Sequence, residues 1–303
     1  MKFKKRYIII LAIIFIIFCL LYLNTGFLQL SKIDNRDLKS WNFSSDGVIL
    51  NAQEIRLIGK NETCWLLLHG YTSTPQELSE LANRLNKEFN ETVIVPRYYG
   101  HGEVPSKILN LTIENWYSQI ASEFEELQNN CEKVNIVGFS FGGAIATKIA
   151  EEEKVNNLYL IAPYFKATYN PFRIFKSEFY LDIFANIISY TKKSKIGQIN
   201  SKEGLEKHIS YWNMPLEPVK YSSKFFKETL NNVNKISEPI LIQHSINDKV
   251  ASFSCSKVIF KNINSTKRDL IQFTKSNHIL LEDFDKLDVI KNIINFENNL
   301  RRL

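Results

Sequence analysis

The serine at position 140 stands in a pattern that could make it a nucleophile. Gly138, Ser140 and Gly142 form a G-x-S-x-G motif between a short apolar run, residues 134–137, and a helical pattern, residues 144–150. A strand that leads straight into a helix must turn sharply, and the glycines leave room for the neighbouring backbone. The serine hydroxyl would then point out of the sheet at the positive end of a helix. The flanking strand and helix make the motif specific, although a glycine-rich turn without chemistry remains the alternative.

A nucleophilic serine needs a base, and the base needs an acid that orients it. In doubly wound sheets such groups lie at the carboxyl ends of strands, so residues that directly follow a predicted strand qualify. Asp248 follows the strand predicted at residues 239–243, and His278 follows the strand predicted at residues 269–273. The spacing therefore predicts Ser140 as the nucleophile, Asp248 as the orienting acid and His278 as the base.

The elements that would position these residues alternate between strand and helix. This alternation indicates a parallel sheet with helices on both faces. One helix is expected to open with a capping box formed by Thr74 and Glu77, with Pro75 at its first position. The predicted strands are residues 46–50, 54–59, 65–68, 92–96, 134–137, 157–162, 239–243 and 269–273, and further helices are predicted at 112–128, 144–150, 253–260 and 284–300.

The alternation stops between residues 163 and 235, where no clear core strand is found. This segment is too long for a simple connection, and we expect an inserted helical cap. Its many aromatic rings indicate an apolar acyl chain as ligand, or they only pack the cap onto the sheet. The aromatic residues are Tyr164, Phe165, Tyr169, Phe172, Phe175, Phe179, Tyr180 and Phe184.

The first 27 residues combine a basic stub with a long uncharged stretch. Four basic residues lie within the first six, and residues 7–23 carry no charge. This pattern predicts an uncleaved transmembrane anchor, with a cytoplasmic N-terminus and the catalytic domain on the non-cytoplasmic side. The alternative, a cleaved signal peptide, lacks a convincing small-x-small cleavage site. Residues 28–45 are predicted as a tether, and residues 46–303 as the catalytic domain.

Composition argues against several other functions. The net charge of +6 is spread along the chain outside the extreme N-terminus, so nucleic acid is not expected as a partner. No spacing of histidine, cysteine and aspartate indicates a metal site, and no cofactor is expected. His69 and His101 are expected to order glycine-rich loops, whereas His208 and His244 belong to no motif.

Taken together, the motifs resemble those of α/β-hydrolase-fold serine hydrolases, and are similar to bacterial carboxylesterases and monoacylglycerol lipases with a small helical cap. The resemblance implies a mostly parallel sheet of about eight strands flanked by helices, with an inserted cap and, here, an N-terminal transmembrane helix. It also implies that the backbone N–H groups of Tyr71 and Phe141 form an oxyanion hole. The matching segments are residues 68–71, 96–102, 138–143, Asp248 with Val250, and 276–278.

The implied function is hydrolysis of carboxylic esters of fatty-acyl type, such as monoacylglycerols or lysolipids, through an acyl-enzyme on Ser140. A small-molecule ester or lipid is therefore the expected partner. A peptidase or acyltransferase with the same triad is one alternative, and a membrane-tethered binding protein without turnover is another. Glu282 and Asp283 are the nearest rival acids, but they follow the histidine, outside the family's order.

The fold implied by the resemblance also bears on the cysteines. Cys64 and Cys131 each stand just ahead of a predicted strand, and these strands would be neighbours in the sheet. An exported domain would permit a disulfide between them. Unrelated free thiols are the alternative.

Overall fold

A computed structural model of the chain describes residues 2–25, 35, 37–168, 189–192, 198–220 and 222–302. Part of the predicted cap therefore lies outside the described residues. This part includes the aromatic residues Tyr169, Phe172, Phe175, Phe179, Tyr180 and Phe184.

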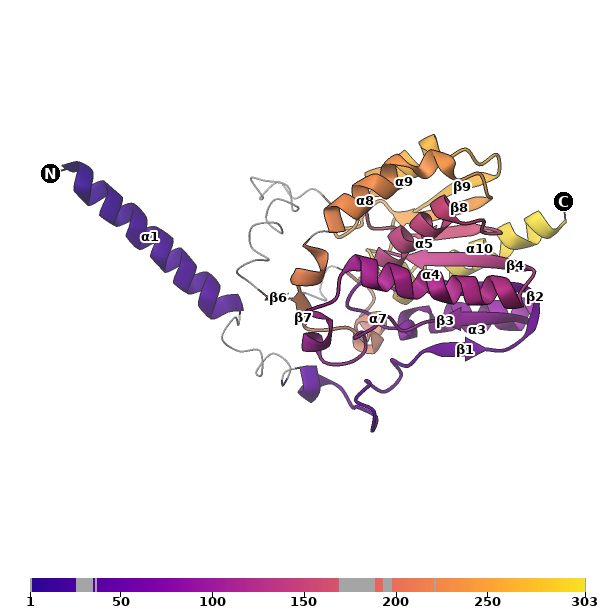
Figure 1. The fold of residues 1–303 in the computed structure, drawn as a ribbon, viewed down its shortest axis with the longest axis horizontal. Coiled ribbons are helices and arrows are strands. Elements are labelled where there is room, and N and C mark those ends of the chain that lie inside the picture. The colour runs from indigo at the N-terminus through magenta and orange to yellow at the C-terminus, as the bar shows by residue number, and fades with distance from the viewer. Residues whose placement is uncertain are drawn as a thin grey trace.

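The main sheet of the described residues has seven strands in the order β1-β3-β2-β4-β5-β8-β9 (Figure 1). β1 pairs with β3 antiparallel, and the other neighbouring strands pair in parallel. Because parallel strands end at the same edge, the residues that follow β2, β4, β8 and β9 gather there. The strands are β1 (Ile55–Leu57), β2 (Lys60–Leu68), β3 (Glu91–Val95), β4 (Lys133–Phe139), β5 (Leu158–Ile161), β8 (Ile240–Ser245) and β9 (Arg268–Phe273).

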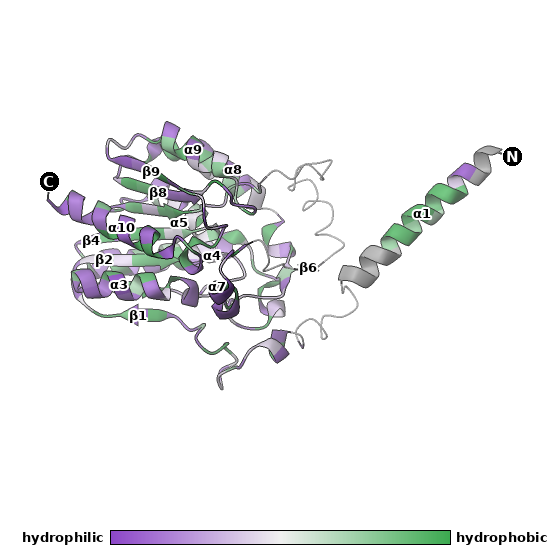
Figure 2. Cartoon of the chain, turned by 180° about the vertical axis from the view of Figure 1, so that it is seen from behind, coloured by the Kyte–Doolittle hydropathy of each residue, from purple (hydrophilic) through white to green (hydrophobic). Residues whose placement is uncertain are grey.

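Helices cover both faces of this sheet, and the side chains of a strand contribute to a hydrophobic cluster on each face. Successive residues of β2 point to opposite faces, so Leu66 joins one hydrophobic cluster and Leu67 joins the other. The first cluster includes residues of α4, α5 and α9, and the second includes residues of α3 and α10. Figure 2 shows the hydrophobic strands between these helices. The helices are α3 (Ser79–Phe89), α4 (Ile113–Asn130), α5 (Phe141–Glu152), α9 (Phe253–Asn262) and α10 (Lys286–Arg301).

The mostly parallel sheet is confirmed, but it has seven strands where about eight were expected. The strand predicted at residues 46–50 does not form. Only an isolated bridge joins Phe43 to Ile49, because Gly47 (φ 81°) and Asn51 (φ 69°) turn the chain here. Of the two strands predicted at residues 46–50 and 54–59, only the second forms, as β1, which pairs with β3 at the edge of the sheet.

The capping box predicted at Thr74 is also wrong. The Thr74 side chain makes no capping hydrogen bond, and the segment begins as a short 3-10 helix, η1 (Pro75–Leu78), ahead of α3. The Glu77 carboxylate instead accepts hydrogen bonds from the Gly70 N–H at 2.5 Å and from the Ser73 hydroxyl at 2.6 Å. Glu77 thus supports the loop after β2 and leaves the helix start uncapped.

The described part of the predicted cap contains helices and a small ribbon. β6 (Tyr190–Lys192) and β7 (Asn213–Pro215) pair antiparallel in a separate two-stranded sheet. α7 (Lys202–Lys207) lies between them in sequence, and α8 (Ser222–Asn231) follows. Phe226 of α8 packs its ring against the rings of Tyr164 and Phe165. These described cap aromatics therefore serve to pack the cap onto the domain.

The N-terminal apolar stretch forms the helix α1 (Lys2–Thr25). Figure 2 colours its middle part as hydrophobic, and the apolar side chains from Tyr7 to Phe18 that are described are at least half exposed. Even so, none of the helices among the described residues is long and apolar enough to span a membrane. The transmembrane helix expected over residues 7–23 is thus not found.

Cys64 and Cys131 form a disulfide, with Cα atoms 6.0 Å apart. Cys64 lies in β2, and Cys131 ends α4 immediately ahead of β4. Because β2 and β4 pair in parallel, with Cys64 opposite Val134, the two cysteines meet near the amino end of β4. The sequence allowed either a disulfide or two free thiols, and the structure contains the disulfide.

Candidate active site

Ser140 sits at a sharp turn between β4 and α5. Its backbone takes φ 53° and ψ −116°, a conformation that residues with a Cβ rarely adopt. The turn is possible because glycines stand where the backbones meet. A Cβ on Gly142 would lie 2.3 Å from the carbonyl oxygen of Leu68, and one on Gly138 would lie 2.5 Å from the carbonyl oxygen of Gly142. The close approach of neighbouring backbones that the G-x-S-x-G motif predicts is thus present in the structure.

The structure brings the three predicted catalytic residues into one hydrogen-bonded row. Nε2 of His278 lies 2.8 Å from Oγ of Ser140, and Nδ1 of His278 lies 2.7 Å from Oδ2 of Asp248. All three side chains are buried, with Ser140 7% exposed. They reach this edge from three different strand ends, after β4, β8 and β9. In such a row the imidazole can take the serine proton while the carboxylate holds the ring.

Asp248 is held from several sides. Its Oδ1 accepts the backbone N–H groups of Val250 at 2.7 Å and Ala251 at 2.8 Å. Burial by itself would raise the pKa of Asp248, but the facing imidazoles of His278 and His244 outweigh it. The pKa of this carboxyl therefore lies below its usual range, and the group stays ionised.

Tyr71 and Phe141, the residues expected to form the oxyanion hole, follow neighbouring strands of the sheet, β2 and β4. Phe141 is the first residue of α5, and Tyr71 follows the end of β2. Their rings lie 5.7 Å apart, and the described residues offer no hydrogen-bond acceptor to either N–H. A free N–H at a helix start can bind an oxyanion, and here a second free N–H follows the neighbouring strand.

The loop that carries Tyr71 is supported by a buried neutral histidine. Nδ1 of His69 lies 2.9 Å from the carbonyl oxygen of Gly70, and its Nε2 accepts from the Tyr98 N–H at 3.4 Å. Burial lowers the pKa of His69 to about 3, even though the bond to Gly70 opposes that shift. The ring is thus neutral at ordinary pH, and the expected structural role of His69 fits these contacts. His101 packs its ring against Tyr71 in the same cluster.

The two rival acids contact other partners. Asp283 accepts backbone N–H groups from both sides: Oδ2 binds Asn200 and Asn277, and Oδ1 binds Ser201 and Phe284. Glu282 pairs with the buried ring of His208 at 2.5 Å. Both carboxylates therefore join the cap to the loop that carries His278, and neither touches that histidine's ring through a hydrogen bond.

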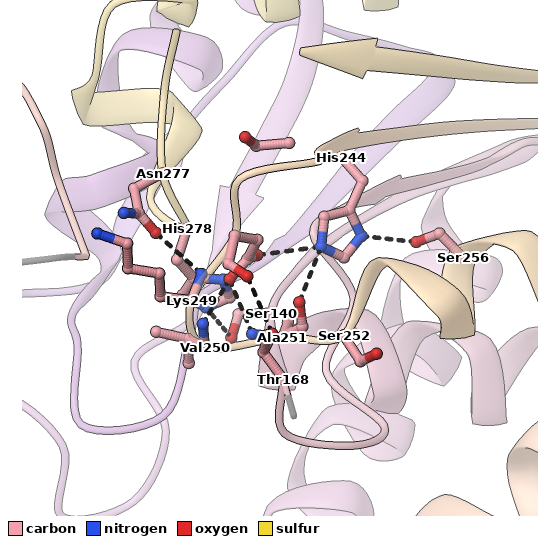
Figure 3. Close-up of polar contacts among 12 residues, drawn as sticks. Ser140, Thr168, His244, Lys249, Val250, Ala251, Ser252, Ser256, Asn277 and His278 are labelled. Atoms are coloured by element: carbon pink, nitrogen blue, oxygen red, sulfur yellow. Dashed lines mark hydrogen bonds and ion pairs between the residues drawn. The ribbon is translucent and has the colours of Figure 1, made fainter. Parts of the chain in front are cut away.

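His244 is the functional neighbour that the motifs did not indicate. It is the next-to-last residue of β8, is fully buried and places Nε2 3.0 Å from Oδ2 of Asp248. Figure 3 shows the ring of His244 apart from that of His278, with a hydrogen bond between His244 and Ser256. A signal is present in the sequence: a histidine directly after a predicted buried strand, four residues before Asp248, must find a polar partner nearby.

An aromatic cluster lies next to Ser140. The Phe141 ring contacts those of Tyr71 and Trp116, and it lies 6.4 Å from the ring of Phe226 in the cap. An apolar group bound here would meet these rings. In the described part of the chain, no group of three or more potential metal ligands is brought together.

Comparisons with known proteins agree with this geometry. The family model described as Serine aminopeptidase, S33, matches residues 59–285. A carboxylesterase of Bacillus subtilis (strain 168) is 22% identical over 237 residues, which cover 78% of this chain and 92% of the relative. A thermostable monoacylglycerol lipase of Bacillus sp. (strain H-257) is 24% identical over 237 residues, which cover 76% and 88%.

The fold is shared with solved structures. A chain from the structural work on LipS and LipT, two metagenome-derived lipolytic enzymes, superposes with a TM-score of 0.75 at 23% identity. The match covers 83% of this chain and 99% of that chain. It extends the similarity from the site to nearly the whole catalytic domain.

Proposed function

Because the chain belongs to the serine aminopeptidase S33 family and is an α/β-hydrolase of the carboxylesterase and lipase type, we propose that it cleaves fatty-acyl esters through an acyl-enzyme on Ser140. The observation that carries this proposal is the continuous row of hydrogen bonds from Ser140 through His278 to Asp248. The curated relatives named as a carboxylesterase and a monoacylglycerol lipase support ester bonds as the target.

In the proposed reaction His278 takes the hydroxyl proton of Ser140 as its oxygen attacks the ester carbonyl carbon. The negative charge that develops on the carbonyl oxygen is met by the N–H groups of Tyr71 and Phe141. His278 then gives its proton to the leaving alcohol, and the acyl group stays on Ser140. A water molecule, activated by the same imidazole, releases the acid and restores the serine.

The proposed acyl group is apolar. The rings of Tyr71, Trp116 and Phe141 next to the serine support this, as does the monoacylglycerol lipase among the relatives. Monoacylglycerols and lysolipids are the substrates we favour. Hydrolysis of p-nitrophenyl esters of increasing acyl length by the full-length chain tests both points, with Ser140→Ala as the control.

We expect turnover that rises from short to medium or long acyl chains and falls by about a thousandfold or more in Ser140→Ala. Equal rates in wild type and variant would overturn the proposal. A sharp preference for acetyl esters would overturn the fatty-acyl part alone.

Peptide cleavage is the second candidate, because the matching family model is described as a serine aminopeptidase. An aminopeptidase needs a carboxylate that binds the substrate's amino terminus. Glu77, Glu282 and Asp283 lie near the site, but each is engaged by other groups of the chain. Amino-acid p-nitroanilides, assayed beside the esters, distinguish the two reactions.

We also propose that the catalytic domain lies on the non-cytoplasmic side. The Cys64–Cys131 disulfide supports this location, since disulfides persist in oxidising compartments. Protease treatment of intact cells tests the location: a domain that is digested only after lysis would contradict it.

A further inference from the structure

Asp248 shares one carboxylate oxygen between two histidines. Its Oδ2 lies 2.7 Å from Nδ1 of His278 and 3.0 Å from Nε2 of His244. The other oxygen, Oδ1, is taken by the N–H groups of Val250 and Ala251. Since Oδ1 is already saturated by backbone donors, the two imidazoles compete for the negative charge on the same atom.

His244 is fixed in place by its own contacts. The ring is fully buried, and its Nδ1 lies 2.7 Å from Oγ of Ser256 on α9. Its Nε2 also lies 3.3 Å from the carbonyl oxygen of Ala251. Both neighbours of Nε2 are acceptors, so that nitrogen must carry a proton, and Nδ1 can accept from the Ser256 hydroxyl. Figure 3 shows the ring between Ser256 and the loop of Val250 and Ala251.

We propose that His244 is a positioning residue for catalysis, which holds the Asp248 carboxylate and limits how strongly that carboxylate stabilises protonated His278. The inference rests on the proposed roles of Ser140 and His278. The hydrogen bond from His244 keeps Oδ2 of Asp248 directed at His278. Part of the negative charge on Oδ2 then interacts with the imidazole of His244 and not with that of His278. The protonated base is then stabilised enough to form, but not so strongly that it stays charged.

The surroundings of Asp248 support this division of charge. The titratable groups that the described residues bring against its carboxylate are the rings of His244 from β8 and His278 from the loop after β9. Thr168 adds a hydroxyl that donates to the backbone oxygen of Asp248, not to its side chain. Although burial opposes it, the two rings together hold the pKa of Asp248 below its usual range.

Two substitutions separate the hydrogen bond from the space that the ring fills. His244→Phe keeps a planar ring but removes the donor, whereas His244→Gln can place an amide N–H near the position of Nε2. We expect kcat/KM for a p-nitrophenyl ester to fall about tenfold in His244→Phe, mainly through kcat. We also expect the acidic limb of its pH–rate profile to move to higher pH, because Asp248 then stabilises protonated His278 more. His244→Gln should restore both values toward wild type.

The path through Asp248 is tested by a double-mutant cycle. If His244 acts through the carboxylate, His244→Phe has little further effect on an Asp248→Asn background, which is already slow. The same fold-loss in both backgrounds would overturn the proposal, and so would an unmoved acidic limb in folded His244→Phe.

A measurement on the unaltered full-length chain covers the case in which His244→Phe does not fold. Nitrogen NMR of labelled histidine rings should show His244 protonated at Nε2, and protonation at Nδ1 alone would overturn the proposal. The outcomes also separate this inference from the proposed function. If the wild type does not hydrolyse esters, the proposed function is wrong. If the wild type is active and His244→Phe is equally active, only the role proposed for His244 is wrong.

Discussion

Ser140 carries backbone strain that its neighbours hold in place. A residue with a Cβ at φ 53° costs on the order of 1–3 kcal/mol, and it persists because α5 and β2 meet backbone to backbone at Gly142. The same contact sets Phe141, the first residue of α5, next to Tyr71. The geometry of the serine and of the proposed oxyanion site therefore depends on Gly142, which has no Cβ to separate α5 from β2.

Gly142→Ala should disrupt this arrangement. The new Cβ would lie 2.3 Å from the Leu68 carbonyl oxygen, so the start of α5 must shift and carry the Phe141 N–H with it. We expect kcat/KM to fall by about a hundredfold or more, the scale for one lost oxyanion donor. Gly47→Ala is the matched control, because Gly47 has φ 81° but open space around it. Steady-state ester hydrolysis by both variants checks the prediction, and similar activities would contradict it.

His69 makes the folded protein sensitive to acid. Because its pKa falls from 6.5 to about 3 on folding, mainly through burial, the unfolded chain binds the extra proton between these values. This contribution to stability is present above pH 6.5 and is lost as the pH falls toward 3. The unfolding temperature, measured across this window, should drop less steeply in His69→Gln than in wild type. Parallel curves for the two proteins would contradict the assignment.

The sequence predicts the relative positions of residues that follow successive strands. Ser140, Asp248 and His278 were placed together because each follows a strand of one parallel sheet, and their geometry agrees with that expectation. The contact of His244 with Asp248 could not be predicted, because a hydrogen bond across a buried turn leaves no repeating pattern. Glu77 was misassigned, since its position fits a capping box while its carboxylate turns back to Gly70.

At the scale of elements, hydrogen bonds of Asp283 connect the cap to the loop that carries His278. Asp283 accepts N–H groups from residues 200 and 201 of the cap and from Asn277, next to His278. Gly204 of α7 sits so close that a Cβ there would lie 1.7 Å from the carbonyl oxygen of Glu282. The segment after His278, at Glu282, thus packs directly against α7.

Asp283→Ala should loosen the cap and the base loop together. Losing this buried acceptor leaves several N–H groups without a partner, so we expect the free energy of unfolding to fall by about 3 kcal/mol. Ester turnover should fall as well, because His278 is held less firmly. Urea unfolding and kinetics on Asp283→Ala check this, with the exposed Asp288→Ala on α10 as control. An Asp283→Ala protein as stable and as active as Asp288→Ala would refute it.

Among the elements, those buried on both faces were predicted best. The apolar runs that became β2, β4, β5 and β8 have a continuous pattern, since helices cover both of their faces. The first predicted strand failed because residues 46–50 face no second strand and turn at Gly47. The pairing of β1 with β3 could not be predicted, because three residues at a sheet edge carry too little pattern.

At the scale of the whole molecule, a covalent link ties the first half of the sheet together. The disulfide joins residues separated by 67 positions, and it closes β2, β3 and α4 into one loop. The sequence alone does not predict whether Cys64 and Cys131 are bonded, because the distance between them depends on the order of the strands in the sheet. The order β3-β2-β4 brings them to adjacent strand ends.

Removing this link should destabilise the catalytic domain. We expect Cys64→Ala/Cys131→Ala to lower the free energy of unfolding by about 2–4 kcal/mol, since the unfolded chain regains the freedom of a long loop. Denaturant unfolding of wild type with and without dithiothreitol gives the comparison. The reductant should lower the stability of wild type to that of the double variant and leave the variant unchanged. A wild type that is indifferent to the reductant would contradict this.

The pairing of β5 with β8 sets the order in which the site can be assembled. During synthesis β4, Ser140 and β5 leave the ribosome before the cap, and β8 and β9 follow it. A nascent chain that ends before residue 240 can form the serine turn, but it has neither the base nor the acid. Long-range parallel pairing is slow, so docking of β8 onto β5 is a late event. The onset of hydrolysis would therefore mark completion of the sheet, and a trapped half-folded chain would hold an inert serine.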